Sequence, residues 1–363
     1  MLNDRMSVSK VLFLDDDPVV RILRLALCDA LSDPWIRDYF APEVVDLAPL
    51  ADAVQGLRRS DGATVFLSGT GPDALPEATT VVFRRGEVDA AFLDRHPALR
   101  FIQRLGERPQ GIDLAETRRR GVRVSCLPRR TLAYTAEHSL LLMLALGKRL
   151  LEGDRAVRLG STAGGNAAAV DGSAYNWAGL SGARGLAGST LGIVGLGEVG
   201  SLVARMANAF GMTVLYYKPR RATPEQEASV GASYTSLDDL LTRADYVALN
   251  AANTPENIGM AGQAFFSHMK SSAYFVNTSR GRLVDEDALY NALTNGSIAG
   301  AGLDVHGVEP RRPGDRFAAL ANVILTPHVA GGARSGLVDE LAVLARNCHA
   351  ALQGGAVAFE LVG

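Results

Sequence analysis

The sequence predicts an α/β protein that combines a doubly wound parallel sheet with a second, smaller α/β unit. Short apolar runs suited to buried parallel strands alternate with helical patterns between residues 190 and 326. A weaker alternation of the same kind occupies the first hundred residues. The chain has 363 residues, which is too long for one core of ordinary size, so we expect two domains.

The larger unit is expected to span residues 128–331. Its predicted strands are 191–194, 213–217, 246–249, 273–277, 300–305 and 323–325. Its predicted helices are 199–210 after a glycine-rich loop, 237–243 with Ser236 as N-cap, and 285–295 ending at Gly296. The apolar stretch 136–146 is expected to form a buried helix that joins the two domains.

The smaller unit is expected to combine residues 1–127 with residues 332–363. Strand-like runs occur at 11–14, 65–68, 81–83 and 101–103. Residues 337–352 have helical apolar spacing, and we expect this segment to pack back onto the N-terminal residues. Residues 160–174 are rich in Gly, Ala and Ser and predict a loop inserted before the first strand of the larger unit.

Composition excludes several classes of function. The formal net charge is -2 and no basic run is long enough to hold a phosphate backbone, so nucleic acid is not an expected partner. The three cysteines, Cys28, Cys126 and Cys348, are far apart and predict reduced thiols with neither a disulfide framework nor a metal site. The sequence shows no export signal and no apolar run of membrane-spanning length, so we expect a cytoplasmic protein without a membrane partner.

A glycine fingerprint follows the first strand of the larger unit and opens its first helix. It consists of Gly195, Leu196, Gly197, Glu198, Val199 and Gly200. Glycines at this spacing allow a tight turn, the close approach of a pyrophosphate, and close packing of a helix whose N-terminus attracts the phosphates. Glycines also occur in ordinary turns, but the strand before them and the helix after them favour a dinucleotide-binding Rossmann domain.

The end of the second strand of this domain carries positive charge. Lys218 lies about twenty positions beyond the glycines, where an acidic residue would bind both ribose hydroxyls, and Arg220 and Arg221 follow it. These cations would attract a 2′-phosphate, so NADP(H) is favoured as the cofactor and NAD(H) is possible. The alternative is a basic loop that is charged only for solubility.

Three polar residues each follow a predicted strand. Arg280 precedes Gly281, and its planar guanidinium suits a carboxylate and the adjacent carbonyl, with a surface ion pair as the alternative. His328 follows Pro327 and has the chemistry for proton exchange with an alcohol or ketone, with a structural histidine as the alternative. Glu309 would bind the far ring nitrogen, fix the tautomer and favour the charged imidazole. Together they predict hydride chemistry on an anionic substrate.

Other polar residues are expected to be structural. His138 begins the helix 136–146 and is expected to make hydrogen bonds where the domains join, and His306 is expected to fill space near the active site. The acidic run 15–17 superficially resembles the acidic pocket of a phosphoacceptor domain, but no aspartate ends the third strand-like run. A solvated turn is therefore expected there.

From about residue 99 to residue 332 the chain resembles the D-isomer-specific 2-hydroxyacid dehydrogenases, a family that includes phosphoglycerate, hydroxypyruvate and glyoxylate reductases. The similarity is carried by the segments 191–197, 277–289, 303–310 and 326–332. It implies a catalytic role for Arg280, Glu309 and His328. The cofactor contacts that we expect beyond the glycines and the basic turn are Asn250, Thr278, Ser279 and Asp304. The resemblance also implies a flavodoxin-like substrate domain split between the two chain ends, and a homodimer built on the cofactor domain.

The sequence departs from the family pattern near the expected substrate. In the loop 104–113 the second of the usual glycines is Arg108, and the usual Pro-Gly-Ala before the crossing helix is Pro128-Arg129-Arg130. The usual His-x-Pro after the strand 246–249 is Asn250-Ala251-Ala252. The expected substrate contacts are Gly106, Glu107, Arg108, Arg84 and Arg85. The added positive charge favours a small anionic 2-keto or 2-hydroxy acid, and a second anionic group on it is a further expectation.

The expected reaction is reversible hydride transfer between a nicotinamide and C2 of a D-2-hydroxy or 2-keto acid. Arg280 would bind the substrate, and His328, charged through Glu309, would donate the proton in reduction. Two alternatives stay open: a nicotinamide-sensing binding protein similar to the C-terminal-binding corepressors, and a formate or phosphite dehydrogenase. Formate enzymes of this fold usually lack the glutamate, so Glu309 argues against the second.

Overall fold

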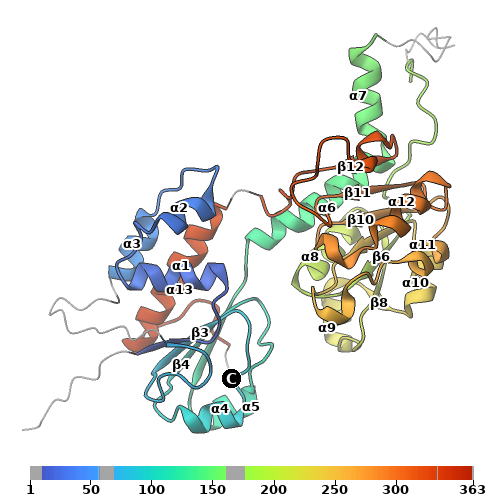
Figure 1. Ribbon diagram of the computed structural model, residues 1–363. Helices are drawn as coiled ribbons and strands as arrows, with labels where there is room; N and C mark the ends of the chain where they lie inside the picture. The colour runs from blue at the N-terminus through green and yellow to red at the C-terminus, as the bar shows by residue number, and fades with distance from the viewer. Residues whose placement is uncertain (1–9, 56, 58–68, 161–175, 333, 362–363) are drawn as a thin grey trace, which may run out of the picture. The chain divides into compact units, whose positions relative to one another are not determined.

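The computed structural model describes residues 10–55, 57, 69–160, 176–332 and 334–361. The chain forms two compact units (Figure 1): a smaller unit, Met1–Thr131 with Ala333–Gly363, and a larger unit, Leu132–Gly332. The predicted strand 65–68 and all but the first residue of the predicted loop 160–174 lie outside the described residues. Each unit contains a parallel sheet, as the sequence predicts.

The smaller unit contains a five-stranded parallel sheet in the order β2-β1-β3-β4-β5. The strands are β1 (Val11–Phe13), β2 (Gly69–Thr70), β3 (Thr80–Phe83), β4 (Phe101–Leu105) and β5 (Arg123–Leu127). This strand order is that of flavodoxin-like folds, so the predicted class is confirmed. The sequence prediction does not include β5, because Arg123 and Ser125 interrupt its apolar residues and no continuous apolar run is present.

The C-terminal helix returns to the N-terminal part of the chain. The helices of the smaller unit are α1 (Pro18–Leu27), α2 (Pro34–Phe40), α3 (Ala48–Gln55), α4 (Ala90–Arg95), α5 (Leu114–Arg119) and α13 (Gly336–Leu352). Leu341, Leu344 and Cys348 of α13 share one core with Val11 and Phe101. Figure 1 shows α13, in red, beside the blue helices α1 and α3. The helical spacing of residues 337–352 therefore predicts this packing correctly.

The turn after β1 corrects one expectation. Asp17 is not a solvated turn residue: it is only 9% exposed, caps α1 by accepting from the backbone of Val19, and pairs with Arg84 at 2.6 Å. Asp15 accepts from the backbone N–H groups of Arg84 and Arg85 at 2.8 and 2.9 Å. These acids fix the loop after β3, and the guanidinium of Arg84 already has an anionic partner.

The larger unit contains a seven-stranded parallel sheet in the order β12-β11-β10-β9-β6-β7-β8. Its strands are β6 (Thr190–Val194), β7 (Thr213–Tyr217), β8 (Ser233–Tyr234), β9 (Tyr246–Leu249), β10 (Tyr274–Asn277), β11 (Gly300–Leu303) and β12 (Val323–Leu325). The apolar runs predict all of these except β8, which has two residues and is too short to show a pattern. The doubly wound class is confirmed.

The helices of the larger unit include the buried crossing helix. They are α6 (Thr131–Gly147), α7 (Leu150–Arg158), α8 (Glu198–Ala209), α9 (Pro224–Val230), α10 (Leu237–Arg243), α11 (Gln263–His268) and α12 (Glu286–Thr294). Ala136, Leu140 and Met143 of α6 are buried in the core of the larger unit. Within the described ranges, no helix has the length and apolar character needed to cross a membrane.

The strand order of the larger unit determines where its polar loops meet. β6 and β9 are neighbours, but the chain proceeds from them to opposite sides of the sheet, so their carboxyl ends form the place where such folds bind ligands. β10, β11 and β12 are adjacent and parallel, with Asn277 beside Leu303 and Leu303 beside Leu325. The three loops that follow these strands therefore lie at one edge of the sheet.

Candidate active site

The glycine loop has the geometry that a dinucleotide needs. Gly195 has a φ of +104°, and a Cβ there would lie 2.6 Å from the backbone of Asn250. A Cβ on Gly200 would lie 2.3 Å from the carbonyl oxygen of Gly195, so only glycine lets α8 start this close to the turn. At Gly197 the Cβ position has no described atom within 4 Å, which leaves room above the helix N-terminus.

Two polar features of this loop suit a nicotinamide dinucleotide. The twelve-residue helix α8 has Gly197 as its N-cap with no side-chain cap, so its first N–H groups can bind a pyrophosphate. At the end of β9, the side-chain nitrogen of Asn250 is buried and has no hydrogen-bond partner among the described residues. A buried amide donor in this position fits a polar ligand, and Leu196, Glu198 and Val199 complete the loop.

The basic turn after β7 is only partly as expected. Lys218 is half-buried and Arg220 is exposed, but Arg221 donates two hydrogen bonds to Glu227 of α9, at 2.8 and 2.9 Å. Hydrogen bonds from Arg221 and from the Tyr216 hydroxyl lower the pKa of Glu227 to about 2. The guanidinium of Arg221 therefore has a carboxylate partner within the protein, and the contact of these three cations with a 2′-phosphate stays a prediction.

His328 and Glu309 form a hydrogen-bonded pair at the edge of the sheet. The distance from Nδ1 of His328 to Oε2 of Glu309 is 2.7 Å, and the other carboxylate oxygen accepts from the backbone N–H of His306 at 2.9 Å. Partial burial raises the pKa of the Glu309 carboxyl, but the hydrogen bonds from His328 and His306 outweigh it and hold the pKa below its usual value. The ionised carboxylate places the ring proton on Nδ1 and leaves Nε2 for a substrate.

Asp304 fixes the turn that carries His328. His328 has a φ of +56°, which is uncommon for a residue with a side chain, and its N–H donates to the carbonyl oxygen of Asp304. The Asp304 carboxylate is fully buried and accepts from the backbone of Val329 and Ala330 at 2.9 and 2.8 Å, and from the hydroxyl of Thr326 at 2.6 Å. These bonds give Asp304 a structural task, and its contact with a cofactor stays a prediction.

His138 joins this network from α6. Its Nε2 lies 3.0 Å from the hydroxyl of Thr326, which in turn donates to Asp304. Sequence reasoning expects His138 to be a structural residue, but nothing in its neighbourhood predicts a partner 188 positions along the chain. It therefore supports the loop of His328, a contact that only the fold makes.

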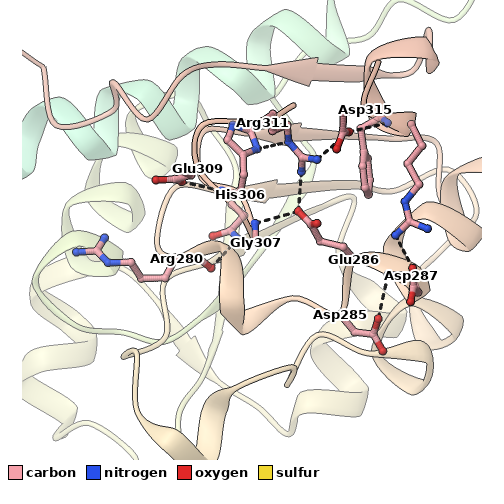
Figure 2. A network of polar contacts seen from close by, with 12 residues as sticks. Arg280, Asp285, Glu286, Asp287, His306, Gly307, Glu309, Arg311 and Asp315 are labelled. Atoms are coloured by element: carbon pink, nitrogen blue, oxygen red, sulfur yellow. Dashed lines mark hydrogen bonds and ion pairs between the residues drawn. The ribbon is translucent and has the colours of Figure 1, made fainter. Parts of the chain in front are cut away.

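Arg280 lies beside the loop of Glu309. A Cβ on Gly281 would lie 2.0 Å from the carbonyl group of His306, so the loop after β10 packs directly on the loop after β11. Figure 2 shows the side chains of Arg280 and Glu309 projecting to the same side of these two loops. The guanidinium of Arg280 is exposed, as expected of a group that binds a ligand, and one of its nitrogens donates to the carbonyl oxygen of Ser279 at 2.6 Å.

Two of the expected cofactor contacts have hydroxyls already engaged in the protein. Thr278 is buried, with its hydroxyl 2.7 Å from that of Ser139. Ser279 donates from its backbone and its hydroxyl to the side chain of Asn277, at 3.0 and 2.7 Å. Both lie at the right edge of the sheet, and their contact with a cofactor stays a prediction.

The expected substrate residues of the smaller unit lie after neighbouring strands. Gly106, Glu107 and Arg108 follow β4, while Arg84 and Arg85 follow β3. Gly106 is buried and its N–H donates to the carbonyl oxygen of Leu127. Because parallel strands end at the same edge, these residues share one edge of the smaller unit's sheet. Their meeting with Arg280 and His328 stays a prediction.

Residues 140–330 match the model of the D-isomer specific 2-hydroxyacid dehydrogenase, NAD binding domain, which covers more than half of the chain. The chain belongs to this family. It is therefore an oxidoreductase with an NAD(H)-binding domain, and the strand-end positions of Arg280, Glu309 and His328 lie inside the matched region.

Relatives and solved structures agree with this assignment. A Staphylococcus aureus (strain MRSA252) protein named as a 2-hydroxyacid dehydrogenase is 41% identical over 243 residues, which cover 67% of this chain and 72% of the relative. A glyoxylate reductase of Korarchaeum cryptofilum (strain OPF8) is 39% identical over 243 residues, covering 67% and 70%. The crystal structure of a Thermus thermophilus protein is similar with a TM-score of 0.53 and 29% identity, over 97% of this chain and all of the other.

Proposed function

We propose that this protein interconverts a small 2-keto acid and its D-2-hydroxy acid, with Arg280, Glu309 and His328 as catalytic residues. The observation that carries the proposal is the 2.7 Å hydrogen bond between Nδ1 of His328 and Glu309. A carboxylate in this position orients the imidazole ring and directs Nε2 outward, where it can give a proton to a ketone oxygen. No other histidine of the described chain is paired with a carboxylate at hydrogen-bond distance.

The protein's own groups account for the proton and the substrate charge. In reduction, Nε2 of His328 donates a proton to the carbonyl oxygen of the substrate while C2 receives a hydride, and in oxidation both transfers reverse. Arg280 binds the substrate carboxylate through its planar guanidinium and polarises the ketone. A bound nicotinamide supplies or accepts the hydride, and the glycine loop with Asn250 would hold the cofactor.

The substrate class rests on the arginines of the smaller unit. Glyoxylate is a suitable first substrate, because a relative is named as a glyoxylate reductase. Arg108 is half-buried in the loop after β4, and we propose that it favours a second anionic group. Arg108→Gly should lower kcat/KM for a dicarboxylic keto acid relative to glyoxylate by about tenfold. An unchanged ratio of the two values would exclude this role.

Cofactor preference is a finer proposal. Lys218 and Arg220 remain the candidates for a 2′-phosphate ligand, and they support a preference for NADP(H) over NAD(H). Arg221 contributes only if it leaves Glu227, so the preference should be weaker than three cations would give.

The proposed oligomeric state rests on the exposed apolar residues of helix α7. We propose a homodimer built on the larger unit, working in the cytoplasm. Helix α7 buries none of its residues, and Leu150, Leu151 and Val157 are 53%, 57% and 56% exposed. Apolar side chains exposed together on one short helix suit a second copy of the chain. Light scattering on wild type and on a Leu151→Asp, Val157→Asp variant tests this, with a monomeric variant as the expected result.

The experiment that tests the proposed function is a panel of 2-keto acids assayed with NADH and NADPH. Turnover of at least one keto acid, with consumption of the reduced cofactor, is expected. A protein that binds reduced cofactor tightly but turns over no keto acid would support the nicotinamide-sensing alternative instead. Formate and phosphite with the oxidised cofactors complete the panel.

A further inference from the structure

A network of polar side chains surrounds Arg311, beside the loop that carries Glu309 (Figure 2). It links the start of α12, the loop after β11 and the segment before Phe317. Its members are Glu286, His306, Arg311 and Asp315. The expected catalytic mechanism uses none of them, although the backbone of His306 binds Glu309 and Glu286 contacts the same loop at Gly307.

Arg311 is the centre of this network, and its side chain is only 13% exposed. Its three guanidinium nitrogens donate to His306 at 2.7 Å, to Glu286 at 2.6 Å and to Asp315 at 2.8 Å. The guanidinium also lies 4.7 Å above the centre of the Phe317 ring. Because each nitrogen has a partner and one face is stacked, the orientation of the fork is fixed.

His306 connects Arg311 to both halves of the catalytic pair. Its Nδ1 accepts from Arg311, which can only donate, so the ring proton lies on Nε2 and is donated to the carbonyl oxygen of Thr326 at 2.9 Å. The backbone N–H of the same residue donates to Glu309 at 2.9 Å. Thr326 lies two residues before His328, so one residue fixes the carboxylate and the strand end that carries the catalytic ring.

Glu286 holds the backbone of this loop from the other side. The same oxygen that accepts from Arg311 also accepts from the N–H of Gly307 at 3.0 Å. A Cβ on Gly307 would lie 3.0 Å from the carboxyl carbon of Glu286, so the contact is close. The backbone at residues 306–307 is therefore held between Glu286 and Gly281.

We propose that Arg311 and His306, oriented by Glu286, are positioning residues for the Glu309–His328 pair. Arg311 selects the ring tautomer of His306, and that tautomer is the one that can donate to Thr326. Without this tautomer of His306, the Glu309 carboxylate and the His328 ring lose the residue that supports both. Nε2 of His328 is then no longer held where a ketone oxygen would receive its proton. This inference rests on the proposed function, since it concerns the same acid–base pair.

The chain offers a matched control for Arg311. Arg316 pairs with Asp287, on the same first turn of α12, and its guanidinium lies 5.6 Å above the same Phe317 ring. It makes no hydrogen bond to His306. Arg316→Met therefore removes an arginine, an ion pair to α12 and an aromatic contact, but leaves the support of the catalytic pair intact.

Kinetics of Arg311→Met and His306→Phe test the proposal. Both should lower kcat by about 10- to 100-fold, as expected for a displaced catalytic group, with the Kd for NADH unchanged and KM affected less than kcat. Arg316→Met should change kcat by less than about twofold. The variant that combines Arg311→Met with His306→Phe should have a kcat no lower than that of His306→Phe alone, because Arg311 acts through His306. His306→Gln, whose amide can still donate to Thr326, should recover part of kcat.

Equal kcat values in Arg311→Met and Arg316→Met would overturn the proposal, as would multiplicative effects in the double variant. If Arg311→Met does not bind NADH, the comparison of His306→Phe with His306→Gln replaces it. Equal kcat values in these two variants would then overturn the proposal. Nitrogen-15 NMR of the imidazole rings gives a readout independent of activity. His306 should show an unprotonated Nδ1 in wild type and Arg316→Met but not in Arg311→Met, and His328 signals should shift in His306→Phe. Unshifted His328 signals contradict the proposal, whereas a wild type without turnover contradicts only the proposed function.

Discussion

The glycine loop and the catalytic loops share one edge of the larger unit's sheet but are built differently. In the glycine loop the close contacts are between backbone atoms, with Gly200 against Gly195 within six consecutive residues and Gly195 against Asn250 at the end of β9. The Glu309–His328 pair depends instead on side chains from distant segments, including His138 of α6 and Glu286 of α12. Substitutions in the first region should therefore act on cofactor binding, and substitutions in the second should act on turnover.

His328→Ala should separate the two regions most strongly. Loss of the proton donor should lower kcat by about 10²- to 10⁴-fold, the usual value of a positioned acid or base. The Kd for NADH, measured by fluorescence titration, should stay near the wild-type value because the glycine loop is unaffected. Turnover at the wild-type rate would exclude His328 as the catalytic acid.

Gly200→Ala should give the opposite pattern. Its Cβ would lie 2.3 Å from a backbone oxygen, so α8 must move away from the turn, and we expect the Kd for NADH to rise by about tenfold or more and Tm to fall. Gly197→Ala is the matched control, because its Cβ meets no described atom in the absence of cofactor. It should weaken NADH binding while leaving Tm unchanged. An equal loss of Tm in both variants would contradict the inference that Gly200 is needed for packing and Gly197 for space at the cofactor.

The basic turn after β7 concerns a second property of cofactor binding, the preference between NADPH and NADH. Lys218→Asp combined with Arg220→Ala should shift the ratio of kcat/KM for NADPH and NADH towards NADH by about tenfold, since one charge-assisted hydrogen bond has that value. Arg221→Ala should shift the ratio less, because Arg221 is paired with Glu227. A wild-type preference for NADH, or a double variant without a shift, would show that this turn is only solvated surface.

The same ion pair predicts a small dependence of stability on pH. The pKa of Glu227 is lowered from 4.5 to about 2 in the folded chain, so its contribution to stability is present above 4.5 and is lost as pH falls towards 2. The difference in Tm between wild type and Glu227→Gln should be a few degrees at most at pH 7, since Arg221 is largely exposed, and should shrink below pH 4.5. A constant difference across this range would exclude the ionised pair as its cause.

The sequence predicts local features of both regions well. The sequence places Arg280, Glu309 and His328 in the loops after neighbouring strands, and the structure brings these loops to one edge of the sheet, while their catalytic role stays a proposal. The apolar spacing of residues 337–352 likewise predicts the return of α13. These features depend on a few consecutive residues, which a one-dimensional pattern can show.

Partners that the fold brings together are less accessible from sequence. His138 lies 188 residues from Thr326, and Arg311 lies 25 residues from Glu286 on a different element. The pairing of Arg221 with Glu227 has a readable signal, because Thr223, Pro224 and Gln226 form the start of a capped helix that places Glu227 in its first turn. Without α9 in the prediction, Arg221 is expected to be available to the cofactor.

The central claim is that the hydrogen bond from Nδ1 of His328 to Glu309 orients the ring for proton transfer, and the most direct test compares kcat in both directions for wild type and Glu309→Gln. In reduction Nε2 gives a proton, and in oxidation it accepts one. Without the carboxylate the tautomer and the orientation of the ring are no longer fixed, so kcat should fall by about tenfold or more in both directions, while the Kd for NADH stays near the wild-type value. An unchanged kcat in both directions in Glu309→Gln would contradict the claim.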